Sequence, residues 1–380
     1  MKIAVYCEPL CVATSANPGR GMLKELIGIR NQDFFLLITR SDYTKDYYLN
    51  SFFESIREYK NWEVRRLEPS RRIVNIKALF RNKRYCKIDL DADVYLNMDC
   101  DYLGSAARPL IVTLADLSVF KGVNASTYSR KINLWTRRFI LDTGIRFSDR
   151  IAAISHSTKN DLSDFYPGLD INKVSVIHNG IANEWFEGDL NGIKQPYYVW
   201  WGFISPRKNI DGLLYGYREA WKKSGFSERF SSLKIIFSNR TVPNELMVLS
   251  KELGLDSKLH FIPSLNLSDL IKTVTESQGL IFPSNTEGFG VPVIEALACG
   301  RPVIGSSIPA ITEVGGGFIS YCDPASPSSI ANQIFSLEAA RGDIDSPDMR
   351  MDRREYARRF TLANAAQNYS QLIDRTASGL

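Results

Sequence analysis

The repeated alternation of short apolar runs with helical patterns constrains the fold of this chain more than any other feature. In the first half, apolar runs predict strands at residues 3–6, 34–38, 94–96, 111–114, 150–154 and 174–177. Helical patterns follow at residues 22–29 and 158–165, and Gly19 and Gly21 fall in a predicted loop before the first helix. Strand, loop and helix in this order are typical of a parallel sheet covered on both faces.

The second half of the chain restarts the alternation. Strands are predicted at residues 197–201, 233–237, 259–262, 279–282 and 302–305, and helices at residues 209–221, 243–253, 268–276 and 291–298. A chain of 380 residues, 44% of them hydrophobic, is long enough for two such domains. We therefore predict an α/β protein with two Rossmann-like, doubly wound domains facing a cleft, with ligands at the carboxyl ends of the strands.

A segment with two glycines, a proline and little apolar pattern separates the two halves. It predicts a linker at residues 184–196, between an N-terminal domain at residues 1–183 and a C-terminal domain at residues 197–355. The amphipathic tail predicts one or two helices, which leaves residues 356–380 as a C-terminal helical segment.

Several features of the sequence indicate the cellular compartment of the protein. The N-terminus has no apolar stretch long enough for a signal peptide, and no uninterrupted apolar run approaches membrane-spanning length. The six cysteines include no CxxC pair, so neither a zinc knuckle nor a redox motif is indicated. We predict a cytoplasmic protein with reduced cysteines.

Basic residues are concentrated in one stretch, residues 65–87, with Glu68 as its single acidic residue. Its members are Arg65, Arg66, Arg71, Arg72, Lys77, Arg81, Lys83, Arg84 and Lys87. One interpretation is a solvated helix face. The other is a surface that meets anionic lipid headgroups or a polyphosphate acceptor, on the inner face of the plasma membrane. No nucleic-acid-binding motif accompanies the charge, so nucleic acid is not an expected partner.

The most informative segment, residues 282–300, combines a strand end, a polar loop and a helix start. Gly288 and Gly290 allow the backbone to approach a ligand closely, and the helix N-terminus suits phosphate. Glu287 in the loop and Glu295 in the helix are better suited to sugar hydroxyls than to phosphate. They predict contacts with a transferred sugar and with a ribose; the alternative is a loop cap and a helix-surface glutamate.

A second segment places two cations after a strand. Gly202 ends the predicted strand, and Arg207 and Lys208 precede the helix that begins near Asn209. Fixed cations stabilise the charge that grows on a leaving diphosphate. The alternative is a solvated basic helix start.

These segments resemble the family-4 retaining glycosyltransferases of the GT-B fold. Residues 287–296, Glu-Gly-Phe-Gly-x-Pro-x-x-Glu-Ala, are similar to the family's E-x7-E signature, and residues 300–304 and 201–210 extend the likeness. The resemblance implies that Glu287 contacts the donor sugar and Glu295 the ribose. It further implies that the diphosphate is held by Arg207, Lys208 and the backbone of the loop that contains Gly288, Phe289 and Gly290. The C-terminal helix is then expected to return to the N-terminal domain.

Weaker likenesses add further candidates. Gly19 and Gly21 resemble the family's first glycine loop, which approaches the acceptor or the donor phosphate. Ile262 falls where the family's base-binding segment lies, and Arg240 follows a strand near the expected base and phosphate region. His178 resembles the junction into the linker, where it either lines the cleft or is a structural histidine.

One position departs from the family pattern. Many members carry His-Asp after the strand equivalent to residues 111–114, whereas this chain has Ala115 and Asp116. Asp116 is the candidate catalytic residue on the acceptor side, since an acid at a strand end is more often functional than structural in such sheets.

Other classes fit the sequence less well. Asp99-Cys100-Asp101 follows a strand, as in metal-binding glycosyltransferases of the other main fold, but the paired halves do not belong to that fold. We therefore expect no metal and no cofactor.

Nucleotide-sugar 2-epimerases share the architecture without the full set of Glu287, Glu295, Arg207 and Lys208. A nicotinamide dehydrogenase is not indicated, because no G-x-G-x-x-G follows an early strand. That intact set also argues against a non-catalytic scaffold.

The function predicted on this resemblance is retaining hexosyl transfer from a nucleotide-diphosphate sugar. The best candidate is mannose from GDP-mannose, because bacterial members with a short N-terminal domain often use it to build surface polysaccharide such as O-antigen. UDP-hexoses and dTDP-rhamnose remain alternatives. The expected acceptor is an oligosaccharide or a polyprenyl-diphosphate-linked glycan.

Overall fold

The computed structural model describes residues 1–7, 10, 18–39, 42–67, 90–98, 109–121, 131–190, 195–340 and 345–379. The chain forms two compact units. Unit 1 contains Met1–Gly180 and Leu362–Leu380, and unit 2 contains Ile181–Thr361. Each unit is built around one sheet, in which every pairing of neighbouring strands is parallel.

Unit 1 has a seven-stranded sheet in the order β3-β2-β1-β4-β5-β6-β7. The strands are β1 (Lys2–Tyr6), β2 (Phe34–Thr39), β3 (Trp62–Arg66), β4 (Val94–Asn97), β5 (Leu110–Leu114), β6 (Arg150–Ala153) and β7 (Val174–Val176). The chain runs outward from β1 to β3 and then crosses back to β4 on the other side of β1. This reversal is the topological switch point of a doubly wound fold, beside which such folds bind ligands.

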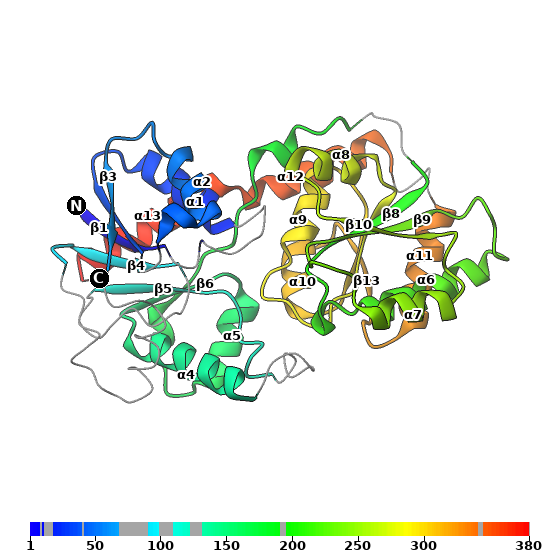
Figure 1. Ribbon diagram of the computed structural model, residues 1–380, viewed down its shortest axis with the longest axis horizontal. Helices are drawn as coiled ribbons and strands as arrows, with labels where there is room; N and C mark the ends of the chain where they lie inside the picture. The colour runs from blue at the N-terminus through cyan, green and yellow to red at the C-terminus, as the bar shows by residue number, and fades with distance from the viewer. Residues whose placement is uncertain are drawn as a thin grey trace. The chain divides into compact units, whose positions relative to one another are not determined.

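Helices cover both faces of this sheet (Figure 1). One face carries α1 (Pro18–Ile29), α2 (Tyr47–Ser55) and α13 (Leu362–Ala377), and the other carries α4 (Lys131–Phe147) and α5 (His156–Phe165). Successive side chains of β1 point to opposite faces, so Ile3 and Val5 enter one core while Ala4 and Tyr6 enter the other. Short 3-10 turns η2 (Tyr43–Lys45) and η4 (Ile171–Lys173) complete the described elements.

The predicted return of the C-terminal helix to the first domain is confirmed. Helix α13 packs on α1, and a Cβ at Gly21 would lie 2.5 Å from Leu362. The guanidinium of Arg30 donates to Ser370 Oγ at 2.8 Å and forms an ion pair with Asp374 at 2.8 Å. The apolar face of α13 thus completes the core of unit 1 rather than that of the unit that precedes it in sequence.

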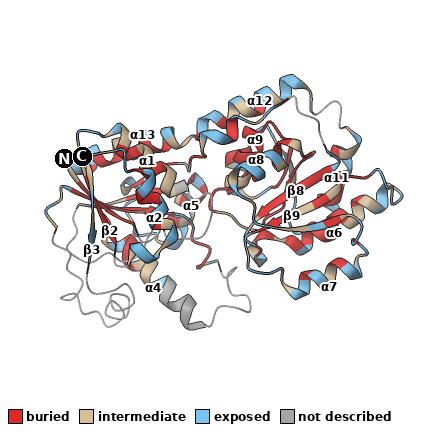
Figure 2. Cartoon of the chain, turned by 45° about the horizontal axis from the view of Figure 1, so that its top comes forward, coloured by how far each residue is buried: buried red, intermediate tan, exposed pale blue. Residues whose placement is uncertain are grey.

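Unit 2 has a six-stranded sheet in the order β10-β9-β8-β11-β12-β13. Its strands are β8 (Tyr197–Gly202), β9 (Ser232–Phe237), β10 (Leu259–Pro263), β11 (Gly279–Phe282), β12 (Val303–Ser306) and β13 (Ser320–Cys322). Its helices are α6 (Ile210–Lys223), α7 (Asn244–Glu252), α8 (Leu267–Glu276), α9 (Val291–Ala298), α10 (Pro309–Gly315), α11 (Pro327–Ala339) and α12 (Pro347–Ala357), with 3-10 turns η5 (Asn183–Phe186), η6 (Pro206–Lys208) and η7 (Arg358–Phe360). The central strands are buried, whereas helices such as α6 and α7 also show an exposed face (Figure 2). The predicted class of two Rossmann-like domains is confirmed.

The predicted linker at residues 184–196 differs from the arrangement in the structure. Trp185, on η5, is buried and stacks on Trp201 with ring centroids 6.1 Å apart, so the start of this segment belongs to unit 2. The division therefore falls at residues 180/181 and 361/362 instead of 183 and 355. Glycines and a proline suggested a linker, but Trp185 and Phe186 supply apolar surface that anchors the chain.

The predicted glycine loop at residues 19–21 is wrong. Gly19 and Gly21 lie in the first turn of α1, which begins at Pro18. Proline is favoured at a helix start because its missing N–H has no partner there in any case. At Gly21 the absent side chain leaves room for the packing of α13.

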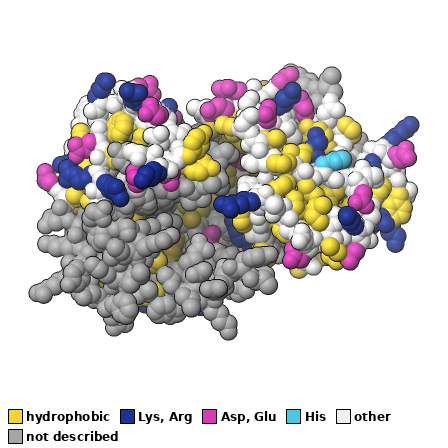
Figure 3. All heavy atoms as spheres, viewed as in Figure 1, with side chains coloured by type: hydrophobic (Ala, Val, Ile, Leu, Met, Phe, Trp, Pro, Cys, Tyr) yellow, Lys and Arg dark blue, Asp and Glu magenta, His cyan; other side chains and the backbone are white. Residues whose placement is uncertain are grey.

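Much of the basic stretch at residues 65–87 lies outside the described residues, as does Asp99-Cys100-Asp101. Arg65 and Arg66 end the edge strand β3 and are exposed. On the face drawn in Figure 3, basic and acidic side chains of the described residues are interspersed rather than gathered by sign. No helix in the described part of the chain is long and apolar enough to cross a membrane.

Candidate active site

Two loops at the carboxyl edge of the unit 2 sheet carry most of the predicted site residues. One joins β8 to α6, the other joins β11 to α9, and the two strands are neighbours in the sheet. The loops are joined directly, because the backbone N–H of Asn285 donates to the carbonyl oxygen of Arg207 at 2.8 Å. Parallel topology thus brings together residues about eighty positions apart in sequence.

Glu287 binds both predicted cations. Its Oε2 lies 2.7 Å from Nη1 of Arg207, and its Oε1 lies 2.6 Å from Nζ of Lys208. The Glu287 side chain is 6% exposed, that of Lys208 9% and that of Arg207 28%. Nζ of Lys208 also lies 4.6 Å from the ring centroid of Phe282, which ends β11. The structure therefore unites three predicted site residues in one largely buried cluster.

The electrostatics of this cluster suit an anionic ligand. Burial raises the pKa of Glu287, but Lys208 and Arg207 outweigh it, so the pKa lies below its ordinary value and the carboxylate is charged at neutral pH. Two cations facing one carboxylate leave an excess of one positive charge. The cluster can therefore accept a diphosphate while keeping a carboxylate beside it.

Glu295 lies deeper than a surface helix residue. The residue is 3% exposed, and its Oε2 accepts a hydrogen bond from Nε1 of Trp201 at 2.9 Å. Burial raises its pKa to about 7, against the opposing effects of the Trp201 hydrogen bond and of Lys208. The alternative of a helix-surface glutamate is therefore wrong, and the ribose contact stays a prediction.

The loop that precedes α9 is packed inward. Phe289 is 2% exposed and meets the ring of Phe360 edge to face at 5.8 Å. Gly290 precedes the first residue of α9 with φ 107°, and a Cβ there would lie 2.6 Å from Ile311 Cδ1. Glycine is thus required both by the backbone conformation and by contact with α10. Gly288 is buried as well, and the diphosphate contact predicted for this loop remains a prediction.

The remaining candidates of unit 2 lie at or near the carboxyl ends of strands β8, β9 and β10 of the same sheet. Gly202 ends β8 with φ 141°, and the carboxamide of Asn239 holds the following loop through Ile204 N at 2.6 Å and Ile204 O at 3.1 Å. Arg240, after β9, is exposed, and Ile262 on the edge strand β10 is half-buried. Asn239 is a site-supporting residue that the sequence did not identify; its position directly before Arg240, after a strand, was the available signal.

Asp116 in unit 1 follows β5, as predicted. The residue is half-buried, and its Oδ1 accepts hydrogen bonds from the backbone N and from Oγ of Ser118. This is a local Asx turn, in which the carboxylate holds its own loop. The catalytic role of Asp116 stays a prediction.

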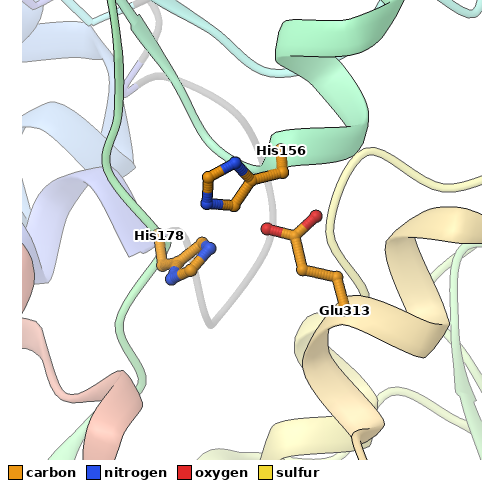
Figure 4. Close-up of side chains that lie close together, drawn as sticks. All are labelled: His156, His178 and Glu313. Atoms are coloured by element: carbon orange, nitrogen blue, oxygen red, sulfur yellow. The ribbon is translucent and has the colours of Figure 1, made fainter.

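His156 and His178 approach each other at the same edge of the unit 1 sheet. His156 begins α5 directly after β6, and His178 follows β7, the neighbouring strand. Their ring centroids are 6.0 Å apart and their planes are inclined by 65° (Figure 4). Glu313, also labelled there, belongs to unit 2. The sequence identified His178 but not this pairing, although both residues follow adjacent strands.

The fold is shared by solved structures that cover the whole of this chain. Sucrose-phosphate synthase from Thermosynechococcus elongatus matches with a TM-score of 0.73, covering 100% of both chains at 16% identity. Anabaena HepE in complex with UDP-glucose matches with a TM-score of 0.66, again over 100% of both chains at 16% identity. Likeness at this level of identity shows the fold, which is the GT-B fold predicted from the sequence.

Sequence comparisons define the class more closely. Residues 183–360 match the family model described as glycosyl transferases group 1. The O-antigen chain mannosyltransferase RfbU of Salmonella typhimurium is 26% identical over 230 residues, 60% of this chain and 61% of that protein. The serotype-specific mannosyltransferase WbdA of Escherichia coli is 29% identical over 184 residues, 44% of this chain and 22% of that protein. Residues 183–360, slightly less than half of the chain, are thus similar to group 1 glycosyl transferases, and the chain spans 61% and 22% of the length of these two relatives. The predicted resemblance to bacterial polysaccharide mannosyltransferases is confirmed.

Proposed function

We propose that this protein is a retaining glycosyltransferase that moves mannose from GDP-mannose to a growing, lipid-linked bacterial surface polysaccharide. The observation that carries the proposal is the cluster in which Glu287 is bound by Arg207 and Lys208. Two relatives named as mannosyltransferases, which this chain covers to 61% and 22% of their length, support mannose as the sugar. UDP-hexoses and dTDP-rhamnose are the alternative donors, and HepE, solved with UDP-glucose, shares the fold.

The cluster suggests how the chemistry proceeds. Arg207 and Lys208 offset the negative charge that grows on the diphosphate as its bond to the sugar breaks. Glu287, ionised beside them, contacts the sugar as it gains oxocarbenium character. The acceptor hydroxyl attacks from the face that the diphosphate leaves, and the departing phosphate oxygen takes the hydroxyl proton. In this scheme Asp116 orients the acceptor, and no side chain is obliged to remove the proton.

We further propose that the reaction needs no metal or other cofactor. In many phosphoryl and glycosyl transfers a divalent cation neutralises the diphosphate, and here two fixed side-chain cations supply that charge. Activity should be unchanged after treatment with EDTA. Loss of activity on chelation, restored by manganese, would contradict this part of the proposal.

Ligand binding and product analysis test the donor. GDP-mannose should raise the thermal midpoint of the protein more than UDP-glucose or dTDP-rhamnose, because a tighter ligand stabilises the folded state by mass action. With a polyprenyl-diphosphate-linked acceptor, NMR of the product should show that the anomeric configuration of the donor is retained. A 2-epimerase would instead convert the nucleotide sugar without acceptor, and that product would refute sugar transfer.

The acceptor proposal extends to the membrane. A lipid-linked glycan places the reaction at the inner face of the plasma membrane, which would give the basic stretch at residues 65–87 a purpose. Binding to vesicles that contain anionic lipid should weaken as salt rises, since exposed charges are screened. Vesicle binding that is independent of salt and of these residues would contradict the membrane role alone.

A further inference from the structure

Asn209 has an unusual backbone conformation directly after the two cations of the site. Its φ of 54° and ψ of 43° are left-handed, and among the described non-glycine residues only Phe226 shares a positive φ. Asparagine tolerates this region better than most residues, but only glycine adopts it without steric cost. The conformation therefore requires support from the surrounding structure.

The carboxamide of Asn209 supplies that support by joining three loops. Its Nδ2 donates to the carbonyl oxygen of Pro283 at 2.9 Å and to that of Pro324 at 2.8 Å. Pro283 opens the loop that carries Glu287, and Pro324 follows β13. Both N–H groups of one amide are thus satisfied by carbonyls from two other strand ends.

Helix α6 leaves room for this side chain because residue 212 is a glycine. A Cβ at Gly212, in the first turn of α6, would lie 2.5 Å from Oδ1 of Asn209 and 2.7 Å from its Nδ2. Any side chain at residue 212 would displace the carboxamide. The turn that presents Arg207 and Lys208 is therefore fixed on one side by the Glu287 loop and on the other by α6.

We propose that Asn209 is a positioning residue that sets the separation between the cationic pair and Glu287. The expected effect on the reaction rate rests on the proposed function. The role of Asn209 in holding the two loops together does not depend on that function. Without the carboxamide, the loops stay joined by the Asn285 N to Arg207 O bond at 2.8 Å and by the Glu287 ion pairs. Two longer bonds, from Asn285 Nδ2 to Pro206 O and from Arg207 Nη1 to Thr286 O, are both 3.4 Å. Displacement of reacting groups by about 1 Å costs on the order of 10²-fold in rate.

Asn209→Gly is the sharpest variant, because glycine accepts the left-handed backbone and removes only the side-chain tether. Asn61→Ala is the matched control, since the Asn61 carboxamide also bonds several carbonyls, those of Ile27, Arg30 and Asp33, in unit 1. Asn209→Gly should lower kcat/KM for the donor on the order of 10²-fold. Part of this change should be a higher donor KM, with the acceptor KM unchanged. Loss of folded protein alone would lower kcat and leave both KM values unchanged.

Amide hydrogen exchange tests the structural content without any substrate. In Asn209→Gly the Asn285 amide should exchange at least about tenfold faster than in the wild type, as local opening becomes easier, while Asn61→Ala leaves it unchanged. Equal exchange at Asn285 in all three proteins overturns the proposal, as does a donor KM that moves equally in both variants. A wild-type protein that transfers no sugar contradicts the proposed function alone, and the exchange result still decides the role of Asn209.

Discussion

The candidate carboxylates at the carboxyl edges of the two sheets, Glu287 in unit 2 and Asp116 in unit 1, are held differently. In unit 2 the residues of one loop bond to residues of another, as in the Glu287 cluster and the Asn209 tether. In unit 1 the candidate Asp116 bonds to Ser118 of its own turn. The Glu287 carboxylate is therefore held by residues of a second loop, whereas the Asp116 carboxylate is held within its own turn.

The largest effect is expected when Glu287, which binds both Arg207 and Lys208, is replaced. Glu287→Ala should cut kcat by roughly 10³-fold, about 4 kcal/mol, because a charge placed for the transition state is lost. Steady-state transfer assays with the donor measure this. Glu338→Gln is the control: Glu338 also binds two groups, Tyr198 Oη at 2.6 Å and Ser231 N at 3.0 Å, at a site without predicted chemistry. Near-wild-type turnover in Glu287→Ala would remove the cluster from the mechanism.

The sequence predicted some parts of the fold and of the candidate site but not others. Apolar periodicity predicted the central strands of both sheets, because a buried parallel strand must be apolar on both faces. It missed the edge strands β3 and β13, which are only partly buried. The sequence predicted Glu287, Arg207 and Lys208 as site residues because each of the two loops carries a contiguous motif. The Asn209 tether did not, since its partners are backbone carbonyls, which carry no sequence signal. The helical position of Gly19 and Gly21 was missed because glycine marks a loop locally, while packing on α13 overrides that preference.

The two cations should contribute equally to kcat/KM but unequally to the stability of the fold. Arg207→Ala and Lys208→Ala should each lower kcat/KM for the donor roughly 10²-fold, because each removes one fixed charge from the diphosphate. Lys208→Ala should also destabilise the fold, since it leaves the buried Glu287 with one partner. Kinetics combined with urea unfolding separate the two effects. Equal stability of the two variants would show that burial of Lys208 does not matter for the fold.

Glu295 offers a test of stability against pH in unit 2. Its folded pKa of about 7 lies above its ordinary value of 4.5, so the folded state binds a proton that the unfolded state releases. The free energy of unfolding should therefore fall as pH rises from about 4.5 to 7, by at most about 3 kcal/mol, and stay level above. Glu295→Gln should flatten this part of the profile, measured by urea unfolding at several pH values. An unchanged slope in the variant would assign the pH dependence to other groups.

The smallest effect is expected at Asp116 of unit 1, whose carboxylate bonds to its own turn. Asp116→Asn keeps an acceptor oxygen for the Ser118 N–H and removes only the charge, so the turn should persist. If Asp116 orients the acceptor hydroxyl, kcat/KM for the acceptor should fall about tenfold, about 1.4 kcal/mol, with the donor KM unchanged. Asp170→Asn is the matched control, because Asp170 makes the same type of turn through Asn172 N at 3.0 Å. Equal acceptor kinetics in the two variants would mean that Asp116 serves its loop alone. The proposed catalytic carboxylates would then be reduced to Glu287 in unit 2, whose pKa Lys208 and Arg207 keep below its ordinary value.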